Sequence, residues 1–140
     1  MEKLKALAKF MEVNTEEIEI DDIENVFTIG DKEYWVMTEE EANAAAKESI
    51  LDAVWFFNPN FICAHNSKID REYLEPAIKG LQENLYENSN DIILGFIDDI
   101  DHFVEDAISV DGRGHFLNTY DGAENEEEID GTLYFIYRVN

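Results

Sequence analysis

The spacing of apolar residues in the first forty positions predicts a helix followed by a β-hairpin. In Glu2–Met11 the apolar residues recur every three or four positions, which is typical of one buried helix face. Val26–Ile29 and Glu33–Met37 are short runs rich in β-branched and aromatic residues, and a Gly-Asp-Lys turn separates them. These two runs predict a pair of antiparallel strands.

The middle of the chain has helical periodicity. Thr38 with Glu41 three residues later forms a capping box, which predicts a helix that begins there and ends before Pro59. The apolar positions of Leu74–Leu85 predict a second helix. Asp91–Ile108 has the most regular apolar face and predicts a third helix, with its acidic residues mostly off that face.

The last thirty residues predict loops and one further strand. Val110–Gly122 is Gly-rich and Ala123–Asp130 is acidic, so both are expected to be loops. Thr132–Val139 is apolar on both faces, as a central strand is. The pattern as a whole predicts an α+β fold, a small antiparallel sheet of about three strands packed against three or four helices, in a single domain over residues 1–140. Three longer helices are expected on one face of the sheet. The expected core contains Phe27, Trp35, Val54, Phe57, Leu81, Ile93, Phe96, Ile97, Ile100, Phe135 and Tyr137.

Charge changes this picture more than any other property. The 140 residues include 33 Asp and Glu against 10 Lys and Arg, for a formal net charge of −23. Nucleic acid and anionic membrane surfaces repel such a chain, so neither is expected as a direct partner. Aromatic residues make up 12% of the chain, which is too many for a disordered acidic tail. A basic protein, a divalent cation or a gain in solubility remain as explanations of the charge.

The acidic residues are least balanced by bases in the second half of the chain. Gly80–Tyr137 holds 15 acidic residues and a single basic one, Arg113. Solubility needs a net charge of only about 2–8, so we expect a functional negative surface. A helix rises about 1.5 Å per residue and duplex DNA carries one charge per about 1.7 Å, so acids along Ile97–Asp106 could imitate a row of phosphates. The expected partner-binding residues are Asp98, Asp99, Asp101, Glu105 and Asp106, with Glu124, Glu126, Glu127 and Glu128.

The Gly-rich segment allows a catalytic and a structural interpretation. His115, Arg113 and Tyr120 are a base, an anion clamp and an auxiliary donor by residue type. Asp-Gly pairs are also ordinary turn sequences, and we favour a structural loop built on Asp111, Arg113, His115 and Asp121. In that interpretation Arg113 is held by a carboxylate, with Asp111, Asp121, Glu105 and Asp106 as the nearby candidates.

No metal site, cofactor or nucleophilic thiol is predicted. His65, His102 and His115 are far apart in sequence and form no ligand pair of known spacing. Cys63 is the only cysteine, which excludes an intramolecular disulfide, and its apolar neighbours favour buried packing over catalysis. The chain also lacks a signal peptide or a long apolar run, so a cytoplasmic location is expected.

Two segments resemble a known group of proteins. The chain resembles small acidic proteins of bacteriophages and mobile elements in two places. The first is Tyr34-Trp35-Val36-Met37-Thr38-Glu39-Glu40-Glu41-Ala42. The second is the tail, with Asp111-Gly112-Arg113-Gly114-His115-Phe116-Leu117, Tyr120-Asp121-Gly122, Glu124-Asn125-Glu126 and Tyr134-Phe135-Ile136-Tyr137-Arg138-Val139-Asn140. Ile50–Ile108 carries no resemblance. The resemblance implies that the gene belongs among phage accessory genes, but it assigns no activity. Phage accessory proteins are often inhibitors of host defence, and acidic ones often mimic DNA.

Charge and resemblance together predict a phage-encoded inhibitor of a host defence nuclease, of anti-CRISPR or anti-restriction type. It is expected to be a non-enzymatic DNA mimic in the host bacterial cytoplasm that occupies a basic nucleic-acid-binding groove. A small enzyme centred on Asp111–Asp121 and a phage assembly protein are the alternatives, and a homodimer is compatible with the sequence.

Overall fold

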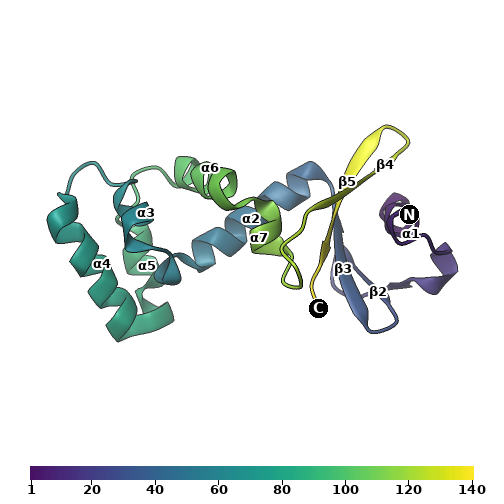
Figure 1. Cartoon of the computed structure of the whole chain (residues 1–140), viewed down its shortest axis with the longest axis horizontal. Coiled ribbons are helices and arrows are strands. Elements are labelled where there is room, and N and C mark those ends of the chain that lie inside the picture. Colours follow the sequence, from purple (N-terminus) through teal and green to yellow (C-terminus); the bar gives the residue numbers. More distant parts are fainter. The chain divides into compact units, whose positions relative to one another are not determined.

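The computed structural model describes all 140 residues, and they form two compact units (Figure 1). The sheet unit consists of Met1–Ala46 and Asp111–Asn140, and the helical unit consists of Lys47–Val110. The helical unit is therefore inserted in sequence between two parts of the sheet unit. The expectation of a single domain stays a prediction. No helix is both long enough and apolar enough to cross a membrane.

The sheet unit is built on five antiparallel strands in the order β1-β2-β3-β5-β4. The expectation of about three strands was too low, because β1 and β4 were not foreseen. The strand β1 has only two residues, and β4 is polar at every position except Ile129, so the apolar pattern does not reveal either strand. The elements of this unit are α1 (Glu2–Met11), η1 (Thr15–Glu17), β1 (Glu19–Ile20), β2 (Val26–Ile29), β3 (Lys32–Met37), the start of α2 (Glu39–Asp52), α7 (Arg113–Leu117), β4 (Asn125–Ile129) and β5 (Thr132–Arg138).

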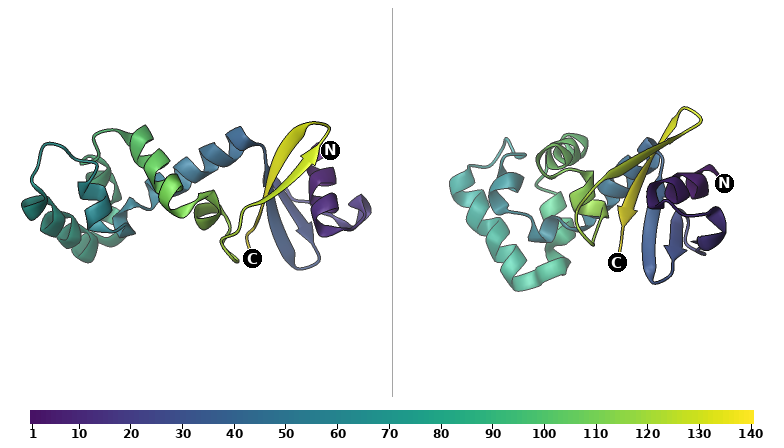
Figure 2. Two further views of the ribbon diagram at one scale, coloured as in Figure 1. Left: turned by 45° about the horizontal axis from the view of Figure 1, so that its top comes forward. Right: turned by 45° about the vertical axis from the view of Figure 1, so that its right-hand side comes forward.

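The strand β5 is paired on both sides, with β3 and with β4, which confirms that the terminal strand contacts the hairpin. Because side chains alternate along a strand, Tyr134 and Ile136 lie on one face and Phe135 and Tyr137 on the other. The first face packs against α1, which lies along the sheet in both views of Figure 2. On the second face, β5 is in contact with α7, where the Arg113 guanidinium lies over the Phe135 ring.

Local capping signals are confirmed at the start of α2. The backbone N–H of Glu41 donates to Thr38 Oγ1 at 3.3 Å, and the N–H of Thr38 donates to a Glu41 carboxylate oxygen at 2.9 Å. The end of this helix was predicted wrongly, because α2 stops at Asp52 instead of continuing to the residue before Pro59. Pro59 is instead the first residue of a new helix, a position where its missing N–H costs nothing.

The helical unit contains shorter helices than the sequence pattern indicates. Its elements are the end of α2, η2 (Val54–Phe56), α3 (Pro59–Cys63), α4 (Arg71–Leu85), η3 (Tyr86–Ser89), α5 (Asn90–Leu94) and most of α6 (Ile100–Asp111). With these, the helices exceed the three or four that were expected. The expected packing of three longer helices on one sheet face is wrong, since α4 and most of α6 belong to this unit.

The predicted helix Asp91–Ile108 is in fact two helices with a break between Leu94 and Ile100. Asp99 causes the second start, because its carboxylate accepts the backbone N–H of His102 at 3.1 Å and so caps α6. The N–H of Asp98 donates to the His65 carbonyl at 2.9 Å, away from any helical partner. The helix α5 therefore ends at its C-cap residue Gly95, Asp98 lies in the connection, and Asp99 begins the next helix.

The predicted core is confirmed in part. Six of its members are buried and five are half-buried, and none is exposed. The buried members are Phe27, Val54, Ile93, Ile97, Phe135 and Tyr137, and the half-buried ones are Trp35, Phe57, Leu81, Phe96 and Ile100.

Candidate protein-binding surface

The acidic residues around the start of α6 are mostly exposed. Asp98, Asp99, Asp101 and Glu105 all face solvent. Asp98 accepts hydrogen bonds from the Ser67 hydroxyl at 2.7 Å and from the Ser67 backbone N–H at 2.8 Å. These two bonds lower the pKa of Asp98, so its carboxylate keeps a fixed position and a full negative charge. The four acids are named the α6 acidic row.

Asp101 is the member of the α6 acidic row that pairs with a cation. Its carboxylate lies 2.9 Å from Lys47 Nζ, and 78% of the Asp101 side chain is exposed. An ion pair between exposed groups contributes little free energy, about 0–1 kcal/mol. A basic partner can therefore displace Lys47 at small cost.

Asp106, which was expected to face a partner, is 41% exposed in its side chain and also contacts a buried histidine. Its carboxylate oxygen lies 2.8 Å from Nε2 of His65, and the His65 side chain is only 5% exposed. The His65 ring also contacts the rings of Phe61, His102 and Phe103. Asp106 thus pairs with a buried imidazole, so its carboxylate is already engaged, unlike those of Asp98, Asp99 and Glu105, which have no cation partner.

The acidic segment before β5 is strand β4, not the loop that was expected. Because residues alternate along a strand, Glu126 and Glu128 are exposed while Glu127 is half-buried. Glu127 is 3.5 Å from Lys9 Nζ, which also donates to the Glu128 carbonyl at 3.3 Å. Glu126 and Glu128 are therefore the two carboxylates of this strand that face solvent, and they are named the β4 acidic row.

Glu124, an exposed residue, takes part in a polar network. Nε of Arg113 donates to its carboxylate at 2.9 Å, and the Tyr137 hydroxyl donates to the same oxygen. Burial alone would lower the pKa of Arg113, but the hydrogen bond to Glu124 raises it above its usual value. Burial, and next the bond to Glu124, raises the pKa of Tyr137. The network stays ionised at Arg113 and neutral at Tyr137 across the physiological range.

The partner of Arg113 was predicted wrongly. Asp111, Asp121, Glu105 and Asp106 were the candidates, and the structure pairs Arg113 with Glu124. Asn43 adds a second acceptor, with its Oδ1 2.9 Å from a terminal guanidinium nitrogen, and the Phe135 ring lies beneath the guanidinium at 4.5 Å. Sequence reasoning missed Asn43 and Phe135 because strand pairing and helix packing, not sequence proximity, bring them to Arg113.

The other residues of the Gly-rich segment are dispersed. Asp111 ends α6, and His115 lies exposed on the short helix α7. The Asp121 carboxylate accepts the backbone N–H of Ala123 at 3.0 Å, as in an ordinary turn. The Arg138 guanidinium lies over the ring of Tyr120, 3.5 Å from its centroid.

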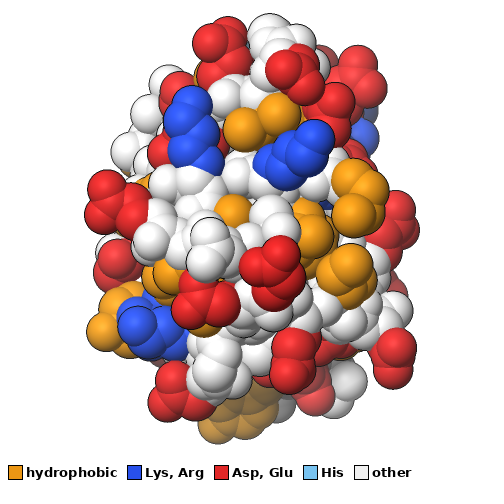
Figure 3. All heavy atoms as spheres, turned by 90° about the vertical axis from the view of Figure 1, so that its right-hand side faces the viewer, with side chains coloured by type: hydrophobic (Ala, Val, Ile, Leu, Met, Phe, Trp, Pro, Cys, Tyr) orange, Lys and Arg blue, Asp and Glu red, His pale blue; other side chains and the backbone are white.

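Each unit is strongly negative by itself. The sheet unit has 20 acidic and 6 basic residues, a net charge of −14, and the helical unit has 13 and 4, a net charge of −9. The ion pairs of the structure engage five carboxylates, namely Glu41, Asp101, Asp106, Glu124 and Glu127. Figure 3 shows one face on which Asp and Glu side chains surround a few Lys or Arg and several apolar groups.

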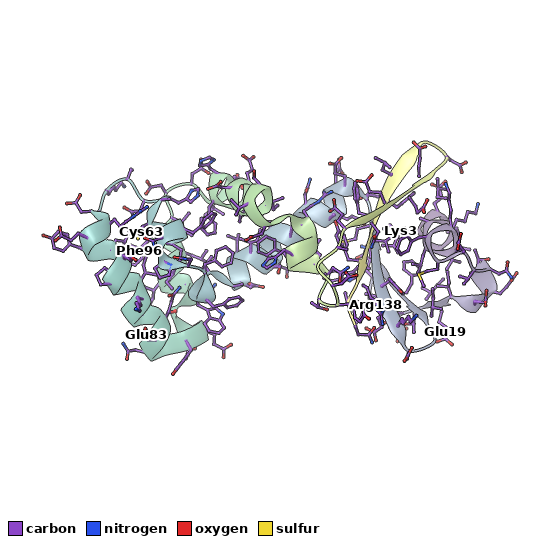
Figure 4. The ribbon with its side chains drawn as sticks, viewed as in Figure 1. Lys3, Glu19, Cys63, Glu83, Phe96 and Arg138 are labelled. Atoms are coloured by element: carbon purple, nitrogen blue, oxygen red, sulfur yellow. The ribbon has the colours of Figure 1, made fainter.

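No group of three or more His, Cys, Asp or Glu side chains is placed to hold a metal ion. Cys63 lies buried in α3 within the helical unit (Figure 4), and burial raises the pKa of its thiol. A thiol with a raised pKa is mostly protonated at neutral pH and is a poor nucleophile. Comparison of the chain with protein-family models, curated proteins and solved structures gives no match.

Proposed function

We propose that this protein is a phage-encoded inhibitor that binds the nucleic-acid groove of a basic host defence nuclease. Its exposed carboxylates would take the places of phosphates and meet the Lys and Arg side chains that normally neutralise DNA. The observation that carries the proposal is the excess of exposed carboxylates over ion pairs in both units. Uncompensated charge of this size opposes folding, so a basic partner that neutralises it gains binding free energy.

The spacing of the two acidic rows supports mimicry of a phosphate backbone. Asp101 and Glu105 are four residues apart on α6, which is about 6 Å along the helix axis. Glu126 and Glu128 are two residues apart on β4, which is about 6.8 Å along the strand. One DNA strand advances about 3.4 Å per phosphate, so each pair spans about two phosphate steps.

The burial and the hydrogen bonds of Arg113 argue against the enzyme alternative. Its side chain is 10% exposed, and two of its nitrogens already donate to Glu124 and Asn43. An anion clamp needs donors aimed at an open position where substrate charge develops. Arg113 instead holds the segment before β4 against the sheet, which favours a structural role.

Competition with DNA tests the proposal directly. Purified CRISPR effector and restriction endonuclease are mixed with labelled duplex DNA and increasing amounts of the protein, at about 50 and about 200 mM salt. We expect the protein to displace DNA from one of these nucleases, with an affinity that falls steeply with salt as DNA affinity does. Failure to displace DNA from any basic nuclease at the lower salt would overturn the proposal.

Charge-neutralised variants locate the contact. Asp101→Asn/Glu105→Gln removes two charges from the α6 acidic row, and Glu48→Gln/Glu72→Gln removes two exposed charges elsewhere in the helical unit. In the sheet unit, Glu126→Gln/Glu128→Gln removes both charges of the β4 acidic row. Its control, Glu19→Gln/Glu24→Gln, removes two exposed charges elsewhere in the same unit. We expect a tenfold or greater loss for at least one row variant and a smaller loss for its counterpart. Equal losses for all four variants would mean that net charge alone is responsible.

A further inference from the structure

The helical unit carries an exposed apolar patch that the core does not account for. Phe56 and Tyr86 are each 64% exposed, Ile92 is 46% exposed and Leu85 is 40% exposed. They belong to η2, η3, α5 and the end of α4, and η3 is in contact with each of the other three elements. These four side chains are named the apolar patch.

The backbone beneath the apolar patch is firmly held. Asn90 accepts the Trp55 backbone N–H at 3.1 Å and donates to the Leu51 carbonyl at 2.7 Å. The hydroxyl of the fully buried Ser89 donates to the Tyr86 carbonyl at 2.7 Å. Side chains presented on an ordered backbone lose little entropy on binding, so the patch is preorganised.

Tyr86 has an unusual backbone conformation that presents its ring to solvent. Its φ of 50° and ψ of −130° lie outside the regions that a bulky L-residue ordinarily adopts. Such strain costs about 1–3 kcal/mol and persists where the surrounding structure enforces it, often at binding sites. Aromatic side chains are also the residues most enriched at interface hot spots.

Acidic residues lie close in sequence to the side chains of the apolar patch. Asp52 lies at the end of α2, Glu83 on the last turns of α4 (Figure 4), Glu87 in η3 and Asp91 in α5. Neither Leu51–Asn58 nor Gly80–Leu94 contains a Lys or Arg. These two segments therefore supply carboxylates and no cation, and the nearest cations in sequence are Lys47 on α2 and Lys79 on α4.

We propose that the apolar patch is a docking site for an amphipathic basic helix of a partner protein. Apolar side chains of that helix would cover Phe56 and Tyr86, and its Lys or Arg side chains would face the surrounding carboxylates. The inference rests on the proposed function for the basic character of the partner, and it adds an apolar anchor at a defined place. A second copy of this chain does not fit, because the helical unit alone carries a net charge of −9.

The two kinds of contact respond differently to salt. Salt screens the attraction between exposed charges, whereas burial of apolar surface is not weakened by it. Binding through the apolar patch should therefore leave a component that survives high salt. Binding through charge alone should leave no component that survives high salt.

A defined peptide tests the proposal. The probe is a synthetic 18-residue peptide with Leu at helical i, i+3, i+4 and i+7 spacing and Lys at the other positions. Its comparison is a peptide of the same composition with that spacing scrambled. Binding is measured by fluorescence anisotropy of labelled peptide at low and at high salt. We expect the amphipathic peptide to bind at least tenfold more tightly than the scrambled one, and to keep measurable binding at high salt.

The protein variant is Phe56→Ser/Tyr86→Ser, chosen because both side chains are 64% exposed. Its matched control is Tyr73→Ser, because Tyr73 is 66% exposed on the same unit but about 18 Å along α4 from Leu85. We expect a tenfold or greater loss of peptide affinity for the double variant and none for the control. Equal affinity of all three proteins, or of both peptides, would overturn the docking site. Circular dichroism of each variant checks that it is folded.

Two further readouts separate the alternatives. The first is sedimentation velocity of the free protein. If the protein is a dimer and Phe56→Ser/Tyr86→Ser makes it a monomer, the patch serves self-association and the proposal is overturned. The DNA competition assay separates the two proposals, because the row variants address the proposed function and the patch variant addresses the docking site. Loss of peptide binding without any displacement of DNA would retain the docking site and reject the inhibitor.

Discussion

Arg113 and Glu124 form an ion pair at 2.9 Å in which Arg113 is 10% and Glu124 28% exposed. The pair joins the short helix α7 to the residue that precedes β4. It is the connection that fixes where the chain enters the last hairpin. Its contribution to stability follows from its burial.

Arg113→Ala should lower the free energy of unfolding by about 3 kcal/mol, because it leaves the Glu124 carboxylate without its cation in a half-buried site. Thermal melts at low salt measure the effect. Arg138→Ala is the control, since Arg138 stacks on exposed Tyr120 and its loss should cost about 1 kcal/mol or less. Adding Glu124→Gln to Arg113→Ala should restore part of the loss. An unchanged melting midpoint for Arg113→Ala would reject the structural role.

Gly114→Ala should destabilise the sheet unit by about 1–3 kcal/mol or more. A Cβ at Gly114 would lie 2.3 Å from the Gly122 carbonyl oxygen, so backbone would have to move. Gly80→Ala is the opposite case, because Gly80 lies in α4 with no atom within 4 Å of an added Cβ. That change should stabilise by about 0.5–1 kcal/mol. Chemical denaturation of both variants gives the comparison, and equal effects would contradict the close approach.

Glu41 makes stability depend on acid pH. Burial alone would raise its pKa, but hydrogen bonds from Lys3, Thr38 and Asn25 lower it to about 2. The pKa of Glu41 is lower in the folded protein than its unfolded value of 4.5. The ionised carboxylate therefore contributes its full share of stability above about pH 4.5, and this share is lost as pH falls towards 2.

Glu41→Gln should therefore cost about 1–2 kcal/mol at pH 7 and progressively less below pH 4.5. Melting midpoints of the variant and the unaltered protein from pH 7 to pH 3 measure the difference. Glu40→Gln, at the exposed neighbouring position, should show a small difference that does not change with pH. A constant difference for Glu41→Gln would show that its charge is not the cause.

Asp106→Ala should lower stability by about 1–3 kcal/mol, because it removes the acceptor of the buried His65 ring. Glu105→Ala changes the preceding residue of the same helix, which is exposed, and should stay within about 0.5 kcal/mol. Urea unfolding of both variants provides the test. Similar values for the two would show that the His65 contact contributes no stability.

The single-domain prediction can be tested with the two tryptophans, Trp35 in β3 and Trp55 in η2, one in each unit. Trp35→Phe and Trp55→Phe leave one reporter each. We expect both variants to unfold at the same urea midpoint, since α2 runs through the division and helices melt cooperatively. Circular dichroism corrects for any loss of stability from the substitution itself. Two separate transitions would make the chain two domains.

Elements that depend on local signals were predicted well. The periodicity of Glu2–Met11, the turn after Ile29 and the capping box at Thr38 each lie within a few residues of sequence, and the structure has all three. Their physical causes are backbone capping, turn geometry and one apolar face, which need no distant partner.

Elements that depend on distant partners were missed. The strand β4 contains three consecutive glutamates, and only its pairing with β5 makes it a strand. The break before Ile100 depends on Asp98 and Asp99, which favour caps and turns, but the apolar periodicity continues through them and hides that signal.

The candidate site was predictable only as a set of charges. The sequence separates acids from bases, but it does not show which carboxylates are already engaged. Asp106 and Glu124 are engaged by His65 and Arg113, which lie 41 and 11 positions away in sequence. The apolar patch was hidden for a similar reason, since Phe56 and Tyr86 look like core residues until the short helices around them are placed.

The insertion of the helical unit within the sheet unit sets an order of events during synthesis. Lys47–Val110 emerges as one continuous stretch and can collect its own contacts at once. The strand β3 must wait for Thr132–Arg138 before its second edge is covered. Until then the growing chain exposes the apolar Tyr34–Met37 edge, which is the moment at which it is most open to misassembly or to a chaperone.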